Sequence, residues 1–445
     1  MTESAPIQYY LDLGASAHVD LLHANNRSGV HLIEDCPLSG FSPVGTFPKD
    51  QALTIAQGYE DSLTPAYVGQ QAYKVHQRRS IDNVTFIGSA YVDLDTYNTD
   101  YAGKSFAEVW EAIQAQFPTL PTPTIAGSSG RGLQLVWCFQ AGKPKAFYPN
   151  WQVMADTLVG ALKEYGADPK ARDLARVLRI SHSYNKKSGT RADLKQTGEP
   201  VTYEALQRWC NAYRKERTPD TPPDTTRTRP VQRRSRSSVA TLPTKNAYTL
   251  HAARMEDYRT LAKIRGGKFI DNRRTAIYLF ACSAAWFCHD SESLMNEVEA
   301  FTERYVDQGE KYTHQHIQEI INRQGEAALG GKRKFKGEDV DPRYRHRNAT
   351  LIRELGITAT EQALLSTVIG KDEKKARDRL RKEAQRRKAG IQTRSDYLAK
   401  VAIGRQERRQ MALDLAERGL SVREIAKELG VGRGSAHRLL TSVPS

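Results

Sequence analysis

The sequence predicts a first domain of the α+β or α/β class, followed by domains made almost entirely of helices. Three observations support this prediction. Strand-like apolar runs alternate with amphipathic helical patterns from about residue 80 to residue 213. A polar segment at 216–246, with five prolines and a series of arginines, then interrupts the pattern. Beyond it, apolar residues recur almost only at helical spacing.

The elements of the first domain follow one another with clear boundaries. The apolar run that begins at Val84 ends on Tyr91-Val92-Asp93-Leu94-Asp95, and a later helical pattern stops at Pro118. The patterns predict strands over 84–95 and 133–139, and helices over 106–117, 151–162 and 202–213. Residues 9–79, which mix short patterns with Pro and Gly, predict loops between short elements.

Length and charge indicate several domains and a polyanionic partner. A chain of 445 residues exceeds the roughly 250–300 residues over which a single core grows. It carries 66 Lys and Arg against 51 Asp and Glu, a formal net charge of +15, so nucleic acid is the expected partner. The expected parts are a catalytic domain, a flexible basic linker, two helical domains and a DNA-binding domain, over 1–215, 216–246, 247–330, 340–395 and 396–445.

Cysteine usage and hydropathy exclude other classes of protein. The five cysteines are scattered and include no Cys-x-x-Cys pair, which argues against a disulfide framework and a zinc ribbon. The N-terminus lacks a signal-like apolar segment, and no stretch of about 18 apolar residues occurs. We therefore expect a cytoplasmic protein with no membrane partner.

Asp93 and Asp95 are the first candidate site. Side chains alternate faces along a strand, so these two carboxylates would point the same way and share a divalent cation. The alternative is a strand that ends in an acidic turn, because Asp is common at strand ends.

Two later segments favour the metal site. Gly127-Ser128-Ser129-Gly130-Arg131-Gly132 leads into the predicted strand at 133–139, and Asp173 precedes Arg176 and Arg179. Carboxylates on a strand, a Gly/Ser/Arg turn and a third acid followed by arginines are the ingredients of metal-dependent phosphoryl transfer. Asp168 competes with Asp173 as the third ligand; we prefer Asp173 because the arginines follow it closely.

The C-terminal segment predicts a helix-turn-helix. Ser421-Val422-Arg423-Glu424 has the form of a capping box, Gly430 allows a turn, and a short polar and basic helix follows. A helical hairpin that does not bind DNA is the alternative. In the DNA-binding interpretation, the second helix enters the major groove through Arg433, Ser435, His437 and Arg438. The basic helix around Lys374–Lys388 is either a second DNA contact or a solvated face.

These motifs resemble the archaeo-eukaryotic primase superfamily, in particular plasmid-encoded primase and primase-polymerase replication proteins. The resemblance covers about residues 80–190 and implies an α+β catalytic domain with small antiparallel sheets. It also implies that Asp93, Asp95 and Asp173 bind catalytic Mg²⁺ or Mn²⁺. NTP or dNTP would be bound by the residues that match the nucleotide-binding motifs, namely Ser129, Arg131, Arg179 and Lys186.

One position departs from the superfamily pattern. Gln134 stands where members usually carry His, and Gln cannot carry the positive charge that a triphosphate attracts. His182 is a possible substitute as a nucleotide contact, or else a structural histidine.

The sequence therefore predicts a replication initiator of a plasmid or mobile element that binds origin DNA and synthesises primers on single-stranded template. A non-catalytic DNA-binding initiator or repressor, and a metal-dependent nuclease, are the alternatives. No Gly-x-x-x-x-Gly-Lys-Ser/Thr motif occurs, so we expect a host helicase and a host replicative polymerase as partners.

Overall fold

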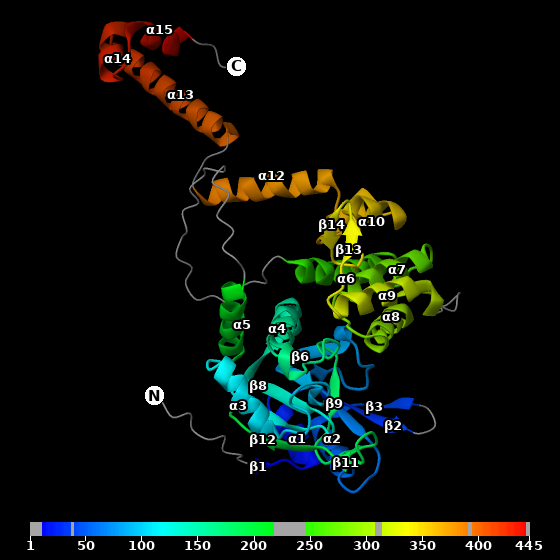
Figure 1. Ribbon diagram of the computed structural model, residues 1–445. Coiled ribbons are helices and arrows are strands. Elements are labelled where there is room, and N and C mark those ends of the chain that lie inside the picture. The colour runs from blue at the N-terminus through cyan, green and yellow to red at the C-terminus, as the bar shows by residue number, and fades with distance from the viewer. Residues whose placement is uncertain (1–10, 37–39, 218–245, 308–313, 390–393, 442–445) are drawn as a thin grey trace. The chain divides into compact units, whose positions relative to one another are not determined.

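The computed structural model describes residues 11–36, 40–217, 246–307, 314–389 and 394–441 (Figure 1). Its contacts divide the chain into two compact units, residues 1–369 and 370–445. The first unit contains both the mixed domain and the helical region that follows it. The predicted linker lies outside the described residues except for its ends, at 216–217 and 246.

The first unit is organised around one antiparallel sheet of ten strands. Their order is β1-β12-β7-β8-β6-β5-β2-β4-β9, with β3 paired to β2. The predicted α+β class is confirmed, although the sheet is larger than the small sheets expected. The strands are β1 (Leu11–Asp12), β2 (Gly29–Cys36), β3 (Gly40–Pro48), β4 (Ala66–Gly69), β5 (Ala72–Tyr73), β6 (Val84–Leu94), β7 (Ile125–Ser128), β8 (Leu133–Pro144), β9 (Val177–Arg179) and β12 (Asp193–Gln196). A separate hairpin joins β10 (Tyr184–Asn185) to β11 (Thr190–Arg191).

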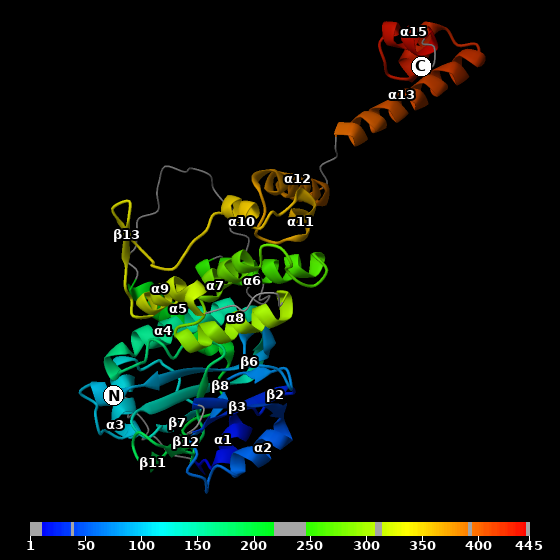
Figure 2. The same ribbon diagram turned by 90° about the vertical axis from the view of Figure 1, so that its right-hand side faces the viewer.

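Helices cover both faces of this sheet (Figure 2). They are α1 (Ala15–Leu22), α2 (Lys49–Gln57), α3 (Phe106–Gln116), α4 (Tyr148–Ala161) and α5 (Tyr203–Arg217). Helices α1 and α2 pack together, α4 packs on β6, and α5 packs on β8. Trp110, Trp137 and Trp151 are fully buried between these layers. The Trp151 indole also donates a 2.8 Å hydrogen bond to the carbonyl of Ser89, which fixes α4 to the central strand.

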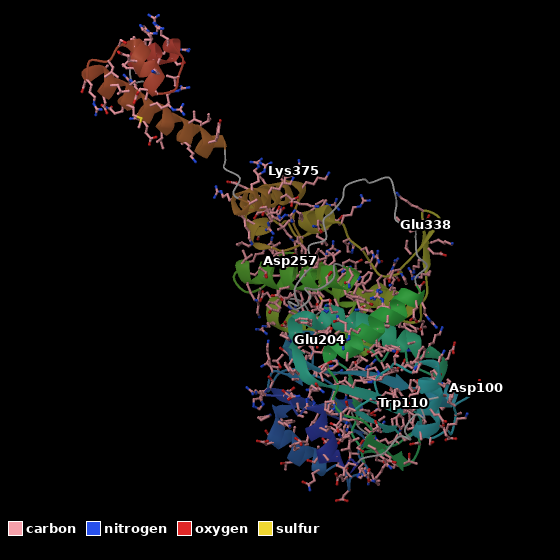
Figure 3. All side chains as sticks on the ribbon, turned by 90° about the vertical axis from the view of Figure 1, so that its left-hand side faces the viewer. Asp100, Trp110, Glu204, Asp257, Glu338 and Lys375 are labelled. Carbon is pink, nitrogen blue, oxygen red and sulfur yellow. The ribbon has the colours of Figure 1, made fainter. Side chains whose placement is uncertain are left out.

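The rest of the first unit is mainly helical. It comprises α6 (Ala247–Ile264), α7 (Arg273–Ala284), α8 (Ser291–Tyr305), α9 (Gln318–Ala328), α10 (Asn348–Glu354), α11 (Ala359–Leu364) and a hairpin of β13 (Arg333–Phe335) with β14 (Glu338–Val340). Asp257 of α6 (Figure 3) accepts hydrogen bonds from the backbone amides of Ser366, Thr367 and Val368, at 2.6, 2.7 and 2.8 Å. This buried carboxylate fastens the end of the unit to α6.

Ion pairs join the helical region to the sheet domain. Arg78, just before β6, contacts Glu303 at 2.8 Å and also pairs with Glu299, both on α8. The neighbouring Arg79 contacts Glu292 of α8 at 3.1 Å. The basic residues before the central strand therefore dock an acidic face of α8.

The second unit contains the predicted helix-turn-helix. Its helices are α12 (Lys371–Lys388), α13 (Arg394–Glu417), α14 (Val422–Glu428) and α15 (Arg433–Thr441). Ala412, Ile425 and Ala436 are buried where α13, α14 and α15 meet. The predicted capping box is present, because Glu424 accepts hydrogen bonds from the Ser421 amide and hydroxyl at 2.8 and 2.7 Å. Across both units, none of the described helices combines the length and apolar character needed to span a membrane.

Candidate functional site

Asp93 and Asp95 lie at the C-terminal end of β6. Asp93 is partly buried within the strand, and Asp95 follows the last strand residue. Two glycines allow close approach to the backbone here. A Cβ added to Gly132 would lie 2.2 Å from the carbonyl oxygen of Leu94, and one added to Gly166 would lie 2.8 Å from that of Asp95. Larger residues at 132 and 166 would therefore displace the acidic pair.

A third carboxylate, from Asp168, lies beside this pair. The Asp168 amide donates a 2.8 Å hydrogen bond to the carbonyl of Asp93, next to a bridge between Leu94 and Ala167. Burial, followed by the negative charges of Asp95 and Asp168, raises the pKa of Asp93 to about 7. Burial and then Asp168 also raise the pKa of Asp95. Asp93, Asp95 and Asp168, the acidic trio, thus share one electrostatic environment.

Asp173, the third ligand that we preferred from the sequence, lies in a different environment. Its side chain is only 1% exposed and accepts a 3.1 Å hydrogen bond from the hydroxyl of Ser293 on α8. It also contacts Arg176 at 3.2 Å, and its other oxygen lies 3.6 Å from Nδ1 of His289. The structure therefore brings Asp168, and not Asp173, to Asp93 and Asp95.

Arg176 connects the acidic trio to the helical region. Its guanidinium lies 3.2 Å from Asp173 and 2.9 Å from Asp290, the N-cap residue of α8. These acidic partners raise the pKa of Arg176 despite its burial. The positive charge of Arg176 also opposes the rise in the pKa of Asp93.

The Gly/Ser/Arg turn forms the connection between β7 and β8. Asn185 holds it in place, because its Nδ2 donates a 2.8 Å hydrogen bond to the carbonyl of Ser129. The exposed Arg131 lies with its guanidinium carbon 4.4 Å from the ring centre of Tyr97, whose hydroxyl hydrogen-bonds Asp95. The charge of Arg131 lowers the pKa of Asp95, against the larger effects of burial and Asp168. The turn thus places a cation near the acidic trio.

Arg179 is the second basic residue near the trio. It donates hydrogen bonds of 2.8 Å to the hydroxyl of Tyr67 and to the carbonyl of Tyr184, and it stacks over the Tyr67 ring at 4.6 Å. Its charge lowers the pKa of Asp93, against the rise from burial and the neighbouring acids. Arg179 is therefore held rigidly, with its charge acting on the site.

Lys186 and His182 are directed toward other acidic residues. Nζ of Lys186 lies 3.5 Å from the carboxylate of Asp35, and Nε2 of His182 lies 3.8 Å from that of Asp12. His182 also has a positive φ of 62°, which fixes a turn before β10. Burial and the charge of Asp168 raise the pKa of Asp95, and the positive charge of Lys187 opposes this rise. We did not select Lys187 from the sequence; the only signal for it is the second lysine after Asn185.

Gln134 lies directly opposite Asp93. The two residues are register partners on β8 and β6, and Gln134 is only 3% exposed. Its partner on the other side is Gly127, which has a φ of +152°. Side chains at paired positions share a face of the sheet, so a neutral amide adjoins the acidic trio.

The resemblance implies Mg²⁺ or Mn²⁺ at this site. Within the described parts of the chain, no three or more His, Cys, Asp or Glu side chains form a group that could hold a metal ion. The acidic trio is therefore not gathered into such a group in this structure, although its carboxylates are the type of hard oxygen ligand that Mg²⁺ and Mn²⁺ take. Burial raises the pKa of Asp93 most, and the negative charges of Asp95 and Asp168, which a cation would neutralise, raise it further.

The predicted DNA-reading residues lie along α15. Arg433, His437 and Arg438 are exposed, whereas Ser435 is partly buried. Ala436 is buried and anchors α15 to α13 and α14. Helix α15 therefore exposes a polar and basic surface, while the buried Ala436 fixes its position against α13 and α14.

Two comparisons of the sequence with known proteins give matches. Residues 404–442 match the family model of a homeodomain-like domain of the helix-turn-helix type. A replication protein of Clostridium perfringens is 26% identical over 302 residues, a match that spans 66% of this chain and 66% of that protein, just under two thirds of its length.

Three solved structures are also similar. The primase-polymerase domain of cyanophage S-2L has a TM-score of 0.34 and 16% identity, over 44% of this chain and 96% of that one. The catalytic domain of primase RepB′ with initiator DNA has a TM-score of 0.30 and 13% identity, over 46% and 97%. Primase RepB′ itself has a TM-score of 0.30 and 14% identity, over 71% and 94%. The chain is thus similar to a replication protein, and the family-model match confirms the C-terminal helix-turn-helix that the sequence predicts.

Proposed function

We propose that the chain is a replication initiator of a plasmid or mobile element, which binds origin DNA and makes primers by template-directed nucleotidyl transfer. The observation that carries this proposal is the shared environment of Asp93, Asp95 and Asp168 at the end of β6. Arg131 and Arg179 act electrostatically on the same carboxylates. Acidic ligands combined with nearby cations suit the handling of a metal-bound triphosphate.

Each part of the site has a role in this proposal. The acidic trio would hold Mg²⁺ or Mn²⁺, which when bound supplies activation of a 3′ hydroxyl and stabilisation of the leaving pyrophosphate. Arg131, Arg179 and Lys187 would neutralise the triphosphate of an NTP or dNTP. Asn185 would keep the turn at 128–132 in position through its hydrogen bond to Ser129. A host helicase and a host replicative polymerase would open the duplex and extend the primers.

A primer-synthesis assay tests the catalytic part. The full-length Asp93→Asn, Asp95→Asn double variant should make no labelled primer on single-stranded template, with NTPs or dNTPs and with Mg²⁺ or Mn²⁺. It should still bind duplex DNA, because the helix-turn-helix belongs to the other unit. The control is Asp100→Asn, an exposed carboxylate on the loop after β6 (Figure 3). Primer synthesis at the wild-type rate by the double variant would overturn the assignment.

The neutral Gln134 opposite Asp93 favours a second candidate, a non-catalytic initiator or repressor. That function predicts duplex binding with no nucleotide incorporation under any of these conditions. A nuclease using the same carboxylates would instead shorten labelled DNA. Two labels resolve all three: labelled nucleotide enters a new strand, labelled input DNA is shortened, or neither changes.

A further inference from the structure

A basic groove lies in the second unit, between the first half of α13 and α15. Its cations are Lys400, Arg405 and Arg408 from α13 and Arg438 from α15. Among the described residues that line the groove, none is acidic. A concave surface that presents four cations from two helices attracts a polyanion.

The length of the groove suits a nucleic-acid backbone. Lys400 and Arg408 are eight positions apart on one helix, which corresponds to about 12 Å along its axis. Successive nucleotides of one strand advance by about 3.4 Å along the duplex axis, so cations about 12 Å apart can contact different phosphates. Gly404, between these cations, leaves the floor open, because a Cβ added there would meet no atom within 4 Å.

Helix α15 has two different polar faces. Ser435 and Arg438 line the groove, whereas Arg433 and His437 are exposed and are not among its lining residues. Arg433 and His437 are four positions apart and so share a face of the helix. The four residues that the sequence predicts as base contacts therefore separate into two pairs.

We propose that this groove holds the phosphate backbone of duplex DNA through Lys400, Arg405, Arg408 and Arg438, while Arg433 and His437 reach the base edges. This inference rests on the proposed binding of origin DNA and extends it with a separate backbone site. A second copy of the chain is the competing occupant, because Tyr397 and Val401 also line the groove. Charge favours DNA, since a protein partner would bury the cations of Lys400, Arg405 and Arg408 in a groove whose described lining residues include no acid.

The test measures the affinity of the full-length protein for two duplexes over a range of salt concentrations. One duplex carries a sequence selected by the protein from a random pool, and the other carries the same bases scrambled. Arg405→Gln with Arg408→Gln should weaken binding to both duplexes equally, by about tenfold. It should also reduce the slope of log affinity against log salt by about 1.8, because each phosphate contact contributes about 0.9.

Two further variants sharpen the test. Gly404→Glu removes no cation and introduces a good helix former, yet its carboxylate should weaken both duplexes equally. Arg433→Gln should instead reduce the preference for the selected duplex by about tenfold or more, with a smaller change in salt slope. The control is Arg418→Gln with Lys427→Gln, two exposed cations outside the groove. It should change the salt slope less than the groove variant does.

The outcomes separate the competing explanations. Equal salt slopes for the groove variant and the control would overturn the proposal. Dissociation of a wild-type dimer by Val401→Ser, with salt slopes unaffected by the cation variants, would overturn it in favour of self-association. If the wild type shows no preference for the selected duplex, origin binding and base reading by Arg433 and His437 are both rejected. The salt slopes of the groove variants then still decide the backbone assignment.

Discussion

The backbone amide of Asp168 donates a 2.8 Å hydrogen bond to the carbonyl of Asp93, and this contact brings the third carboxylate to the candidate site. Five positions later, Asp173 is buried against Ser293 and Arg176 instead. One aspartate is thus a partly exposed member of an acidic group, and the other is part of a buried polar contact with the helical region.

This difference predicts opposite results for the same substitution at the two positions. Asp168→Ala should reduce primer synthesis at least about a hundredfold without lowering the thermal midpoint, because it removes a ligand and a repulsive charge. Asp173→Ala should lower the free energy of unfolding by about 2–3 kcal/mol, because it leaves the buried hydroxyl of Ser293 without its acceptor and Arg176 with Asp290 as its remaining acidic partner. Initial rates and thermal unfolding of both variants check this. If the Asp173→Ala protein is instead stable but inactive, Asp173 is the third metal ligand, as we preferred from the sequence.

The sequence identifies the elements beside the site because their patterns are uninterrupted. The central strand and the helix before Pro118 appear in the structure as β6 and α3, within a residue or two of their predicted ends. The sequence could not show that Asp168 lies closer to the pair than Asp173, because Asp168 reaches the site through a long-range contact between Ala167 and Leu94. No local pattern records such a contact.

Buried charge hides other parts of the fold. The sequence predicts a helical domain over 247–330 but does not delimit α6, because this helix buries Arg254, Asp257 and Arg259, whose charges obscure the apolar stripe that marks a packed helix. These groups are paired in the structure; Asp257, for example, accepts hydrogen bonds from three backbone amides. Because Arg and Asp are seldom buried, a prediction that considers each residue separately expects these positions to be exposed.

The raised pKa of Asp93 predicts how stability depends on pH. Burial, then Asp95 and Asp168, raise its pKa to about 7, whereas an unfolded Asp titrates near about 3.9. The folded state therefore binds the extra proton, and this contribution is complete below about pH 4 and lost as the pH rises to about 7. Asp95→Asn removes one repulsive charge, so it should recover about 1 kcal/mol at pH 8, which is about 1 °C for a unit of this size.

Calorimetry at pH 4 and pH 8 without divalent cations checks this expectation. The gain in stability from Asp95→Asn should vanish at pH 4, where Asp93 is protonated and carries no charge to repel. Added Mg²⁺ should also reduce the stability gain of Asp95→Asn at pH 8, because the ion stabilises the wild type more than the variant. Asp100→Asn serves as the control. An equal gain at both pH values would show that repulsion between Asp93 and Asp95 is not its cause.

The hydrogen bond from Asn185 to Ser129 leads to a separate prediction about nucleotide binding. Asn185→Asp keeps the acceptor for the amide of Lys187, at 3.0 Å, but loses the donor to the carbonyl of Ser129. The turn that carries Arg131 should loosen, so KM for the nucleotide should rise about tenfold while kcat changes little. Steady-state primer synthesis measures both constants.

A matched control exists at the opposite end of β8. Asn25 makes the same type of contact, with its Nδ2 donating to the carbonyl of Gln140 at 2.9 Å. Asn25→Asp should cost similar stability, about 1 kcal/mol, and leave KM unchanged. An equal rise in KM for both variants would assign the effect to general loosening of the sheet.

The last prediction concerns Gln134, which lies opposite Asp93 at the position where the primase resemblance implies His. Gln134→His would place an ionisable group beside the acidic trio. An imidazolium attracts a triphosphate and an imidazole does not, so KM for the nucleotide should fall severalfold at pH 6. That gain should decline as the pH rises through the pKa of the new histidine.

The comparison variant is Gln134→Leu, which keeps a similar volume without charge or hydrogen bonding. Gln134→Leu should raise KM for the nucleotide, and by the same factor at every pH because leucine does not ionise. A KM that is unchanged in both variants would place the triphosphate away from β8. If the wild type makes no primer and Gln134→His does, the neutral side chain opposite Asp93 is what separates this chain from an active polymerase.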